Sequence, residues 1–131
     1  MAKSPLAVGA GGLLVAVGVL GFVPGITSHV GGLAFAGRGS HAELFGQFRV
    51  SVLLNLFHVV SGLPGAVLAR TDSGARSYLT VCGVAYVALW ALGPLQLGGW
   101  VPLNAADNWL HLVGGCTFLG LGSLLASPGR P

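Results

Sequence analysis

The chain has 131 residues, of which 53% are hydrophobic and only 7% are charged. Soluble domains carry about a quarter charged residues, so these few charges leave too little polar surface for a water-soluble globule. Disordered chains combine low hydrophobicity with high charge, which the mean hydropathy of +0.83 excludes. The net charge of +3 is scattered and forms no basic patch, so it does not indicate nucleic-acid binding. We therefore expect lipid to be the solvent for most of the chain.

Four uncharged apolar stretches follow one another along the chain, at residues 6–23, 51–69, 78–97 and 108–126. At a rise of 1.5 Å per residue each forms a helix of roughly 27 to 30 Å, which matches the hydrocarbon core of a bilayer. The sequence thus predicts a single all-α domain, an integral membrane four-helix bundle. A signal peptide is the alternative for the first stretch, but its apolar run is longer than a signal core.

The connection between the first two stretches, residues 24–50, is the longest loop. Loops longer than about 15 residues are functional or locally folded, so we expect this one to lie at the membrane surface or to fold back on the bundle. Positive residues flanking the spans predict orientation. One side has Lys3, Arg70, Arg76 and Arg130, whereas the other has Arg38 and Arg49. This excess predicts cytoplasmic termini and an outer position for the long loop.

The chain repeats itself at an offset of 53 residues. Asn55-Leu56-Phe57-His58, with Gly62 beyond it, aligns with Asn108-Trp109-Leu110-His111 and Gly115. Each half holds two apolar stretches, so the halves have the same orientation, as in repeats related by an axis along the membrane normal. We expect two similar transmembrane hairpins in parallel repeat.

The paired Asn and His residues are the sharpest polar signal. Residues three apart share a helical face, so the repeat predicts His58 and His111 at similar depth, facing one shared site. Because imidazole is a common ligand of haem iron and of metals, a b-type haem or a metal held by these two histidines is one interpretation. A four-histidine metal site that adds His29 and His41 is a variant of it.

The other interpretation is structural. Asp107 and Asn108 stand where a helix begins, and Asx side chains cap the free amides of a first turn. Asn55, His58 and His111 would then hydrogen-bond across helix interfaces formed by small residues, as polar side chains do in membrane bundles. Asn55, His58, Asp107, Asn108 and His111 are therefore candidates for a ligand site or for an interhelical polar site.

Other residues carry weaker signals. Pro64 removes an amide and frees the carbonyl of Val60, which predicts a kink that Ser61 could compensate. Cys82 and Cys116 lie at different depths, so we expect unpaired, buried thiols. The apolar stretches contain no Asp, Glu, Lys or Arg, and no nucleophile stands beside a base. The sequence therefore favours a non-enzymatic protein and indicates no catalytic residues.

Two motifs resemble a known family. They are Pro102-Leu103-Asn104-Ala105-Ala106-Asp107-Asn108-Trp109-Leu110-His111, and Leu44-Phe45-Gly46 with Asn55-Leu56-Phe57-His58 and Gly62. They resemble a bacterial four-helix membrane family catalogued as domain of unknown function 4383, over residues 6–125. The resemblance implies a multi-pass protein of the bacterial plasma membrane and supplies no catalytic residues.

Three functions remain open from the sequence. The leading one is a structural or accessory membrane component, alone, in a larger complex or as a homo-oligomer, whose N-x-x-H motifs join the two hairpins. The second is a redox protein that binds a b-type haem or a metal through His58 and His111. The third is a module that binds lipid or a small molecule between the long outer loop and the outer ends of the second and fourth helices.

Overall fold

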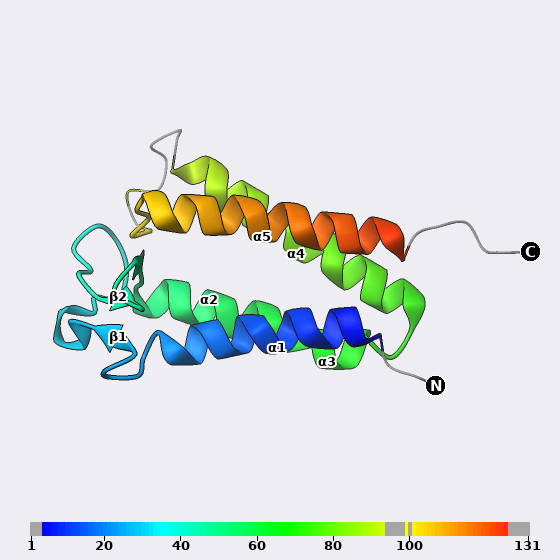
Figure 1. Cartoon of the computed structure of the whole chain (residues 1–131), viewed down its shortest axis with the longest axis horizontal. Helices are drawn as coiled ribbons and strands as arrows, with labels where there is room; N and C mark the ends of the chain where they lie inside the picture. The colour runs from blue at the N-terminus through cyan, green and yellow to red at the C-terminus, as the bar shows by residue number, and fades with distance from the viewer. Residues whose placement is uncertain (1–3, 94–98, 100, 126–131) are drawn as a thin grey trace, which may run out of the picture.

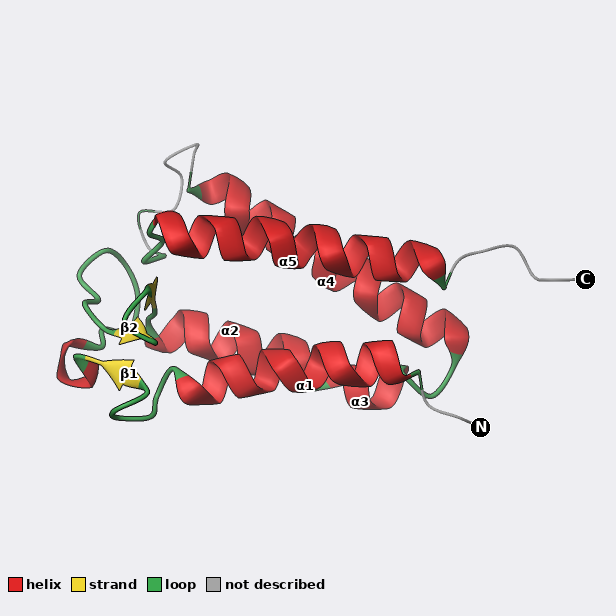
Figure 2. Cartoon of the chain, viewed as in Figure 1, coloured by secondary structure: helices red, strands yellow, loops and turns green. Residues whose placement is uncertain are grey.

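The computed structural model of the chain describes residues 4–93, 99 and 101–125. Most of them are helical, which confirms the predicted helical character (Figure 2). The helices are α1 (Pro5–Leu20), α2 (Val52–Gly62), α3 (Pro64–Leu68), α4 (Asp72–Leu92) and α5 (Ala105–Leu124). A small sheet of β1 (Thr27–Ser28), β2 (Glu43–Leu44) and β3 (Phe48–Arg49), with the short 3-10 helix η1 (Val30–Gly32), was not predicted. The strict all-α prediction is therefore incomplete.

Side-chain caps decide where the helices begin. Ser4, Ser51, Thr71 and Asn104 each accept a hydrogen bond from an amide of the first turn, which satisfies donors that the helix itself leaves free. The cap at Thr71 starts α4 six residues before the apolar stretch, whose predicted end at residue 97 lies outside the described residues. Asn104 likewise starts α5 three residues early, and the predicted end at residue 126 is also not described.

At Pro64, where a kink was predicted, the structure divides the second stretch into α2 and α3. The amide of Ala66 donates to the carbonyl of Leu63 at 3.3 Å, so the carbonyl of Gly62 loses its usual helical partner. The phenol of Tyr78 on α4 donates to the carbonyls of Ser61 and Gly62, at 2.8 and 3.4 Å. The Ser61 hydroxyl, expected to compensate the carbonyl of Val60, donates instead to the carbonyl of His58. A residue on another helix therefore compensates this break, which the sequence alone did not indicate.

Two helix pairs make up the body of the molecule. In Figure 1, α1 runs along α2 and α3, and α4 runs along α5. We call these the first and the second hairpin. Glycines bring the helices of each hairpin together: a Cβ on Gly11 would lie 2.6 Å from the Gly62 carbonyl oxygen, and a Cβ on Gly83 would lie 2.9 Å from that of Gly115. Small residues allow this close approach of backbones.

The long loop folds back over one end of the hairpins, one of the two placements expected for it. Its antiparallel sheet has the order β1-β2-β3, with Thr27 opposite Leu44 and Glu43 opposite Arg49. A small buried cluster of Ala42, Leu44 and Val50 packs against Val17 and Leu20 of α1. The Thr27 hydroxyl also donates to the carbonyl of Leu20 at 2.8 Å. The sheet therefore closes the end of the molecule where α1 ends and α2 begins.

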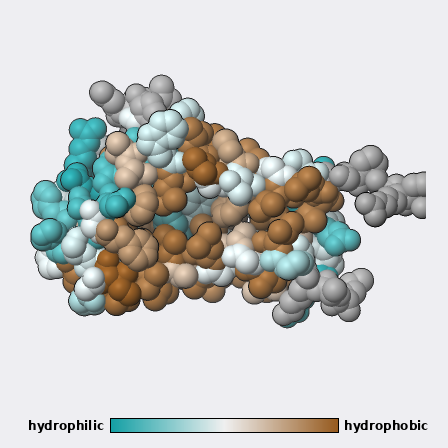
Figure 3. All heavy atoms as spheres, viewed as in Figure 1, coloured by the Kyte–Doolittle hydropathy of each residue, from teal (hydrophilic) through white to brown (hydrophobic). Residues whose placement is uncertain are grey.

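The surface along the helices is apolar. Leu13 on α1, Val60 on α2, Val81 on α4 and Val113 on α5 are 59 to 67% exposed. Figure 3 shows hydrophobic residues along the helices and hydrophilic ones gathered at the sheet end. Among the described residues, α4 is the one helix long and apolar enough to cross a membrane, whereas α1 and the segment Val52–Leu68 are apolar but shorter.

Candidate functional site

His58, Tyr86 and His111 meet between the two hairpins, and we call them the His–Tyr cluster. The ring centroids of the two histidines are 5.8 Å apart, and Tyr86 lies 5.4 Å from His58 and 5.8 Å from His111. His58 is 6% exposed and His111 is 2% exposed. The two imidazoles singled out by the repeat are therefore neighbours in the core, contributed by α2 and α5, with a tyrosine from α4 beside both.

The two histidines differ in their hydrogen bonds. Nδ1 of His58 donates to the carbonyl of Leu54 at 2.8 Å, one turn earlier on α2. This bond places the proton on Nδ1 and leaves Nε2 with a free lone pair. Nδ1 of His111 is buried and has no hydrogen-bond partner in the described part of the chain. Each ring thus has one nitrogen that is not hydrogen-bonded to another residue of the cluster.

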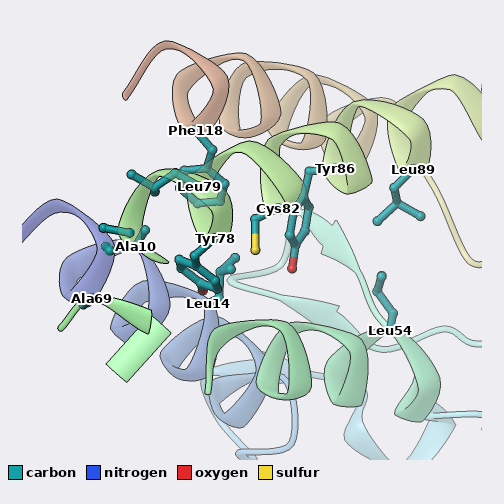
Figure 4. Packing of buried hydrophobic residues seen from close by; sticks show 12 residues of the cluster. Ala10, Leu14, Leu54, Ala69, Tyr78, Leu79, Cys82, Tyr86, Leu89 and Phe118 are labelled. Carbon is teal, nitrogen blue, oxygen red and sulfur yellow. The ribbon is translucent and has the colours of Figure 1, made fainter. Parts of the chain in front are cut away.

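The hydroxyl of Tyr86 joins the hairpins by a direct hydrogen bond. Figure 4 shows Tyr78, Cys82 and Tyr86 pointing from α4 toward the first hairpin. The Ser61 hydroxyl donates to the carbonyl of His58 at 3.1 Å. Its oxygen therefore accepts the proton of Tyr86, 2.8 Å away. Tyr86, whose ring packs against both imidazoles, is therefore hydrogen-bonded to α2, the helix that carries His58.

Asn55 and Asn108 occupy equivalent places that differ from those of the histidines. A Cβ on Gly21 would collide with the side chain of Asn55, and a Cβ on Gly93 would collide with that of Asn108. Each asparagine therefore lies against the end of the other helix in its own hairpin. Nδ2 of Asn55 and Oδ1 of Asn108 are buried without a partner among the described residues. The asparagines pack within the hairpins, whereas the histidines meet between them.

Asp107 belongs to the start of α5, but it is not the N-cap. Asn104 is the N-cap, and Asn104 and Asp107 form a reciprocal capping box: the amide of Asp107 donates to Oδ1 of Asn104 at 2.9 Å, and Oδ2 of Asp107 accepts the Asn104 amide at 3.0 Å. The helix thus begins before the predicted Asp107–Asn108 position, which places His111 deeper than expected.

The capping box also holds the sheet. Nδ2 of Asn104 donates to the carbonyl of Gln47, between β2 and β3, at 2.7 Å. Burial raises the pKa of Asp107 to about 7, although the backbone amides of Asn104 and Arg49 and the Arg49 charge act in the opposite direction. The carboxyl group lies outside the predicted span. Asn104 and Asp107 therefore connect the start of the second hairpin to the loop between α1 and α2 of the first hairpin.

The geometry limits what the histidines can hold. The centroids of the His–Tyr cluster form a nearly equilateral triangle, so Tyr86 stands beside the midpoint where a haem iron would lie, in space that the porphyrin would need. A b-type haem therefore does not fit while Tyr86 keeps this position. His29 and His41 are exposed on the loop, and the described residues contain no group of three or more His, Cys, Asp and Glu that could hold a metal.

An apolar cavity of about 370 Å³ lies between α2 and α4, beside the cluster. Leu54 and Phe57 line it from α2, and Leu89 and Leu92 line it from α4. The sequence placed a ligand pocket at the outer ends of the second and fourth stretches, which correspond to α2 and α5. The cavity instead opens between α2 and α4.

The comparison with known protein families matches residues 5–124 to the family described as Domain of unknown function (DUF4383). The chain belongs to this family. No curated protein and no solved structure matches it. The resemblance predicted from the Asn and His motifs is thus confirmed. The DUF4383 match covers both hairpins and the sheet between α1 and α2.

Sequence reasoning on this DUF4383 chain missed Tyr86 and the repeat of the first helices. Gly11, Val15 and Gly21 of α1 correspond to Gly83, Val87 and Gly93 of α4, because each set makes the same contacts with the second helix of its hairpin. The shared pattern G-x₃-V-x₅-G was present in the sequence, but its offset of 72 residues differs from that of the Asn and His motifs. The longer loop of the first hairpin causes this difference.

Two smaller expectations also changed. Cys82 is buried and unpaired as predicted, but Cys116 is exposed on α5, which corrects the prediction of two buried thiols. In α5 the neighbouring residue Gly115 faces α4, where it contacts Val87, and Cys116 points away from α4. The two cysteines therefore belong to opposite environments of the second hairpin.

Proposed function

We propose that this chain is a non-enzymatic integral membrane protein, a structural or accessory component of the bacterial plasma membrane, in which the His–Tyr cluster joins two transmembrane hairpins. The observation that carries the proposal is an inverted distribution of polarity. Large apolar side chains are exposed on α1, α2, α4 and α5, while His58, Asn55 and His111 are buried. A helix in a soluble protein has its polar residues on the outer face, which is the reverse of this arrangement.

The size of the apolar surface supports a lipid environment. Exposed apolar patches larger than a few hundred Å² are rare on soluble monomers. Here large apolar side chains are exposed on α1, α2, α4 and α5, and hydrophobic residues occur along the helices on the face in Figure 3. The 21 residues of α4 reach about 30 Å, the thickness of the hydrocarbon core. The shorter α1 and α2 lead into the folded loop, which extends the first hairpin at its outer end.

The distribution of termini and charges supports the orientation. The start of α1, the α3–α4 connection and the end of α5 lie at the same end of the molecule, opposite the sheet (Figure 1). Arg70 lies in the α3–α4 connection and Arg76 lies in α4 near its start. In the sequence, Lys3 precedes α1 and Arg130 follows α5, both outside the described residues. The excess of positive residues favours this end as cytoplasmic, with the sheet and the Asp107 capping box outside.

The cluster has the character of a joint rather than of a catalytic centre. Within each hairpin glycines let the backbones touch, whereas between hairpins large side chains fill the space: the imidazoles and the phenols of Tyr78 and Tyr86. In a water-free interior, removal of one partner leaves the other polar group unsatisfied. The cluster therefore fixes which faces of the hairpins meet.

Membrane integration is tested by extraction of cell membranes with alkaline carbonate, which should leave the protein in the pellet. The joint is tested by His58→Gln and His111→Gln, compared with His41→Gln in the exposed loop as a matched control. We expect the two cluster variants to lose about 1 to 3 kcal/mol of unfolding free energy in detergent and the control to lose none. Release by carbonate would contradict the first half of the proposal, and equal stability of all three variants would contradict the second.

Lipid binding is a second candidate because the apolar cavity between α2 and α4 opens beside the cluster. Mass spectrometry of the gently purified protein would support it by detecting a lipid at one per chain. Substitution of Ala88 by Trp, which fills the cavity from α4, should then remove that lipid. Native mass spectrometry of the same sample tests whether the chain associates with itself or with a larger membrane complex.

A further inference from the structure

We infer that the apolar cavity between α2 and α4 holds one acyl chain of a glycerophospholipid from the outer leaflet, and that Arg49 binds the phosphate of this lipid. The inference depends on the second candidate above, lipid binding. It adds the class of lipid, the leaflet and the residue that recognises the headgroup. Three observations support it: the length of the cavity, the character of its lining and the charge at its outer end.

Two cavities adjoin along α2. The first, of about 370 Å³, is lined from α2 and its N-cap by Ser51, Leu53 and Phe57 among others. The second, of about 300 Å³, is more open and is lined by Leu53, Phe57 and Ser61 among others. Because both cavities share Leu53 and Phe57, they form one groove along the helix, which we call the α2 groove. At a rise of 1.5 Å per residue, the groove extends about 15 Å from Ser51 to Ser61.

The length of the α2 groove equals the depth of one leaflet. A hydrocarbon core about 30 Å thick has leaflets of about 15 Å. The groove begins at Ser51, the N-cap of α2 at the sheet end, and Ser61 lies about halfway along the apolar segment Val52–Leu68. With the sheet outside, as proposed above, the groove belongs to the outer leaflet. An acyl chain of that leaflet covers the same depth in the same direction.

The lining of the groove favours a hydrocarbon chain over a polar ligand. Serines are the only polar side chains among the described residues that line it. Both bond to the protein: Oγ of Ser51 accepts the amide of Leu54 at 3.1 Å, and the Ser61 hydroxyl bonds to Tyr86 at 2.8 Å. Pockets for polar small molecules contain polar groups that orient the ligand. The walls of an empty apolar cavity lose dispersion contacts, which an acyl chain restores.

Arg49 stands at the outer end of the groove. Successive side chains of an extended backbone point to opposite faces, and the backbone is extended from Arg49 in β3 to Ser51. Val50 packs in the buried cluster against α1. Arg49 and Ser51 therefore point to the other side, where Ser51 lines the groove. Two residues of a strand span about 7 Å, so Arg49 lies at the level of a lipid headgroup above the groove.

The guanidinium of Arg49 is available to an anion. Its Nη2 lies 3.9 Å from Oε1 of Glu43, and the two side chains are 35% and 29% exposed. This distance exceeds that of a hydrogen bond, and ion pairs so exposed contribute little to stability. Nε of Arg49 also has no hydrogen-bond partner in the described part of the chain. Arginine binds phosphate through two parallel hydrogen bonds, so a lipid phosphate is a better partner for Arg49 than the distant carboxylate.

The groove is tested with the full-length protein, delipidated in detergent and titrated with phosphatidylglycerol in native mass spectrometry. We expect one lipid per chain. Ala88→Trp, which fills the groove from α4, should lower the affinity about tenfold or more. Val84→Trp is the matched control, because Val84 is exposed on α4 and does not line the groove. Equal binding by the two variants would overturn the groove as the site.

The headgroup is tested with a diacylglycerol that has the same acyl chains and no phosphate. Because hydrogen bonds to charged groups are among the stronger ones, phosphatidylglycerol should bind the parent about tenfold more tightly than the diacylglycerol. Arg49→Gln should remove this preference, whereas Arg38→Gln, in an exposed position of the same loop, should keep it. Equal affinities of the two lipids for the parent would refute the role of Arg49 and leave lipid binding standing.

Photo-crosslinking locates the acyl chain. The parent protein in nanodiscs, with phosphatidylglycerol that has a diazirine in mid-chain, should crosslink at Leu53, Phe57 and Ala88. Equally strong crosslinks to α1 and α5 would show general lipid contact and overturn the site. A dimer that Ala88→Trp abolishes would show that a second copy fills the groove, and would also overturn it. Circular dichroism checks that each variant is folded. A parent that resists carbonate extraction but binds no phospholipid would refute this inference and leave the membrane protein and its joint standing.

Discussion

Substitution of Gly115 by alanine tests whether direct backbone contact holds the second hairpin together. A Cβ at this position would lie 2.8 Å from the amide nitrogen and from Cγ2 of Val87, and 3.0 Å from the carbonyl oxygen of Gly83. Non-bonded carbon contacts are optimal at about 3.5 to 4.0 Å, so α4 and α5 would have to separate. The atoms in the way include backbone, which cannot rotate aside.

Two opposing effects determine the size of the change. Overpacking of this kind costs about 1 to 3 kcal/mol, whereas replacing a helical glycine by alanine contributes about 1 kcal/mol of helix propensity. The neighbouring Gly114 isolates the second effect because nothing lies within 4 Å of a Cβ built there. We expect Gly114→Ala to be neutral or stabilising and Gly115→Ala to be about 1 to 3 kcal/mol less stable than Gly114→Ala.

The assay is reversible unfolding of both variants in mixed detergent micelles, followed by circular dichroism. Gly11→Ala and Gly12→Ala repeat the comparison in the first hairpin, since Gly11 lies against the Gly62 carbonyl and Gly12 faces open space. Equal stability of Gly115→Ala and Gly114→Ala would refute the close approach of α4 and α5 and, with it, the equivalence of the two hairpins.

Three further changes test the polar contacts. Gly93→Ala should destabilise the protein because the new Cβ collides with the side chain of Asn108. Adding Asn108→Ala should recover part of this loss, and a double-mutant cycle should give a coupling free energy of about 0.5 to 3 kcal/mol. Additive effects of the two substitutions would argue against the contact. Tyr86→Phe should cost about 0.5 to 1.5 kcal/mol of unfolding free energy, because it removes the bond to Ser61; an unchanged value would mean that this bond does not hold the hairpins. Because burial raises the pKa of Asp107 from 3.8 to about 7, the folded state binds this proton more tightly, so stability should be highest below about pH 4 and fall as pH rises through 7. Asp107→Asn should flatten that part of a melting-temperature profile, and an identical profile would show that another group is responsible.

Local patterns allowed the helical segments to be predicted. Apolar runs without charges and residues such as Ser51 and Asn104 act within one or two turns of the chain, so they can be read from neighbouring letters. The ends were less accurate because capping extends a helix beyond its apolar run, as Thr71 does for α4. The sheet was missed because its strands have two residues each and form only when Ala42, Leu44 and Val50 pack on α1.

The candidate site was predictable in part. The repeat predicted His58 and His111 at similar depth, and in the structure their ring centroids are 5.8 Å apart. It could not show that Asn55 and Asn108 pack against Gly21 and Gly93 inside each hairpin, because the rotation of each helix about its axis depends on its neighbour. Tyr86 carried no signal, since its role comes from a contact with residues 25 positions away on either side.

The scarcity of charge in this sequence determined that the chain would fold as apolar helices with few polar side chains inside, and the repeat determined that those few would come in pairs. Both properties follow from the order of residues along single helices. The tertiary structure decided that the paired histidines meet each other and that a tyrosine, rather than a macrocycle, stands beside them. It did so because contacts between hairpins depend on how closely the glycines let each helix pair pack, and that distance is set only when all the helices are assembled.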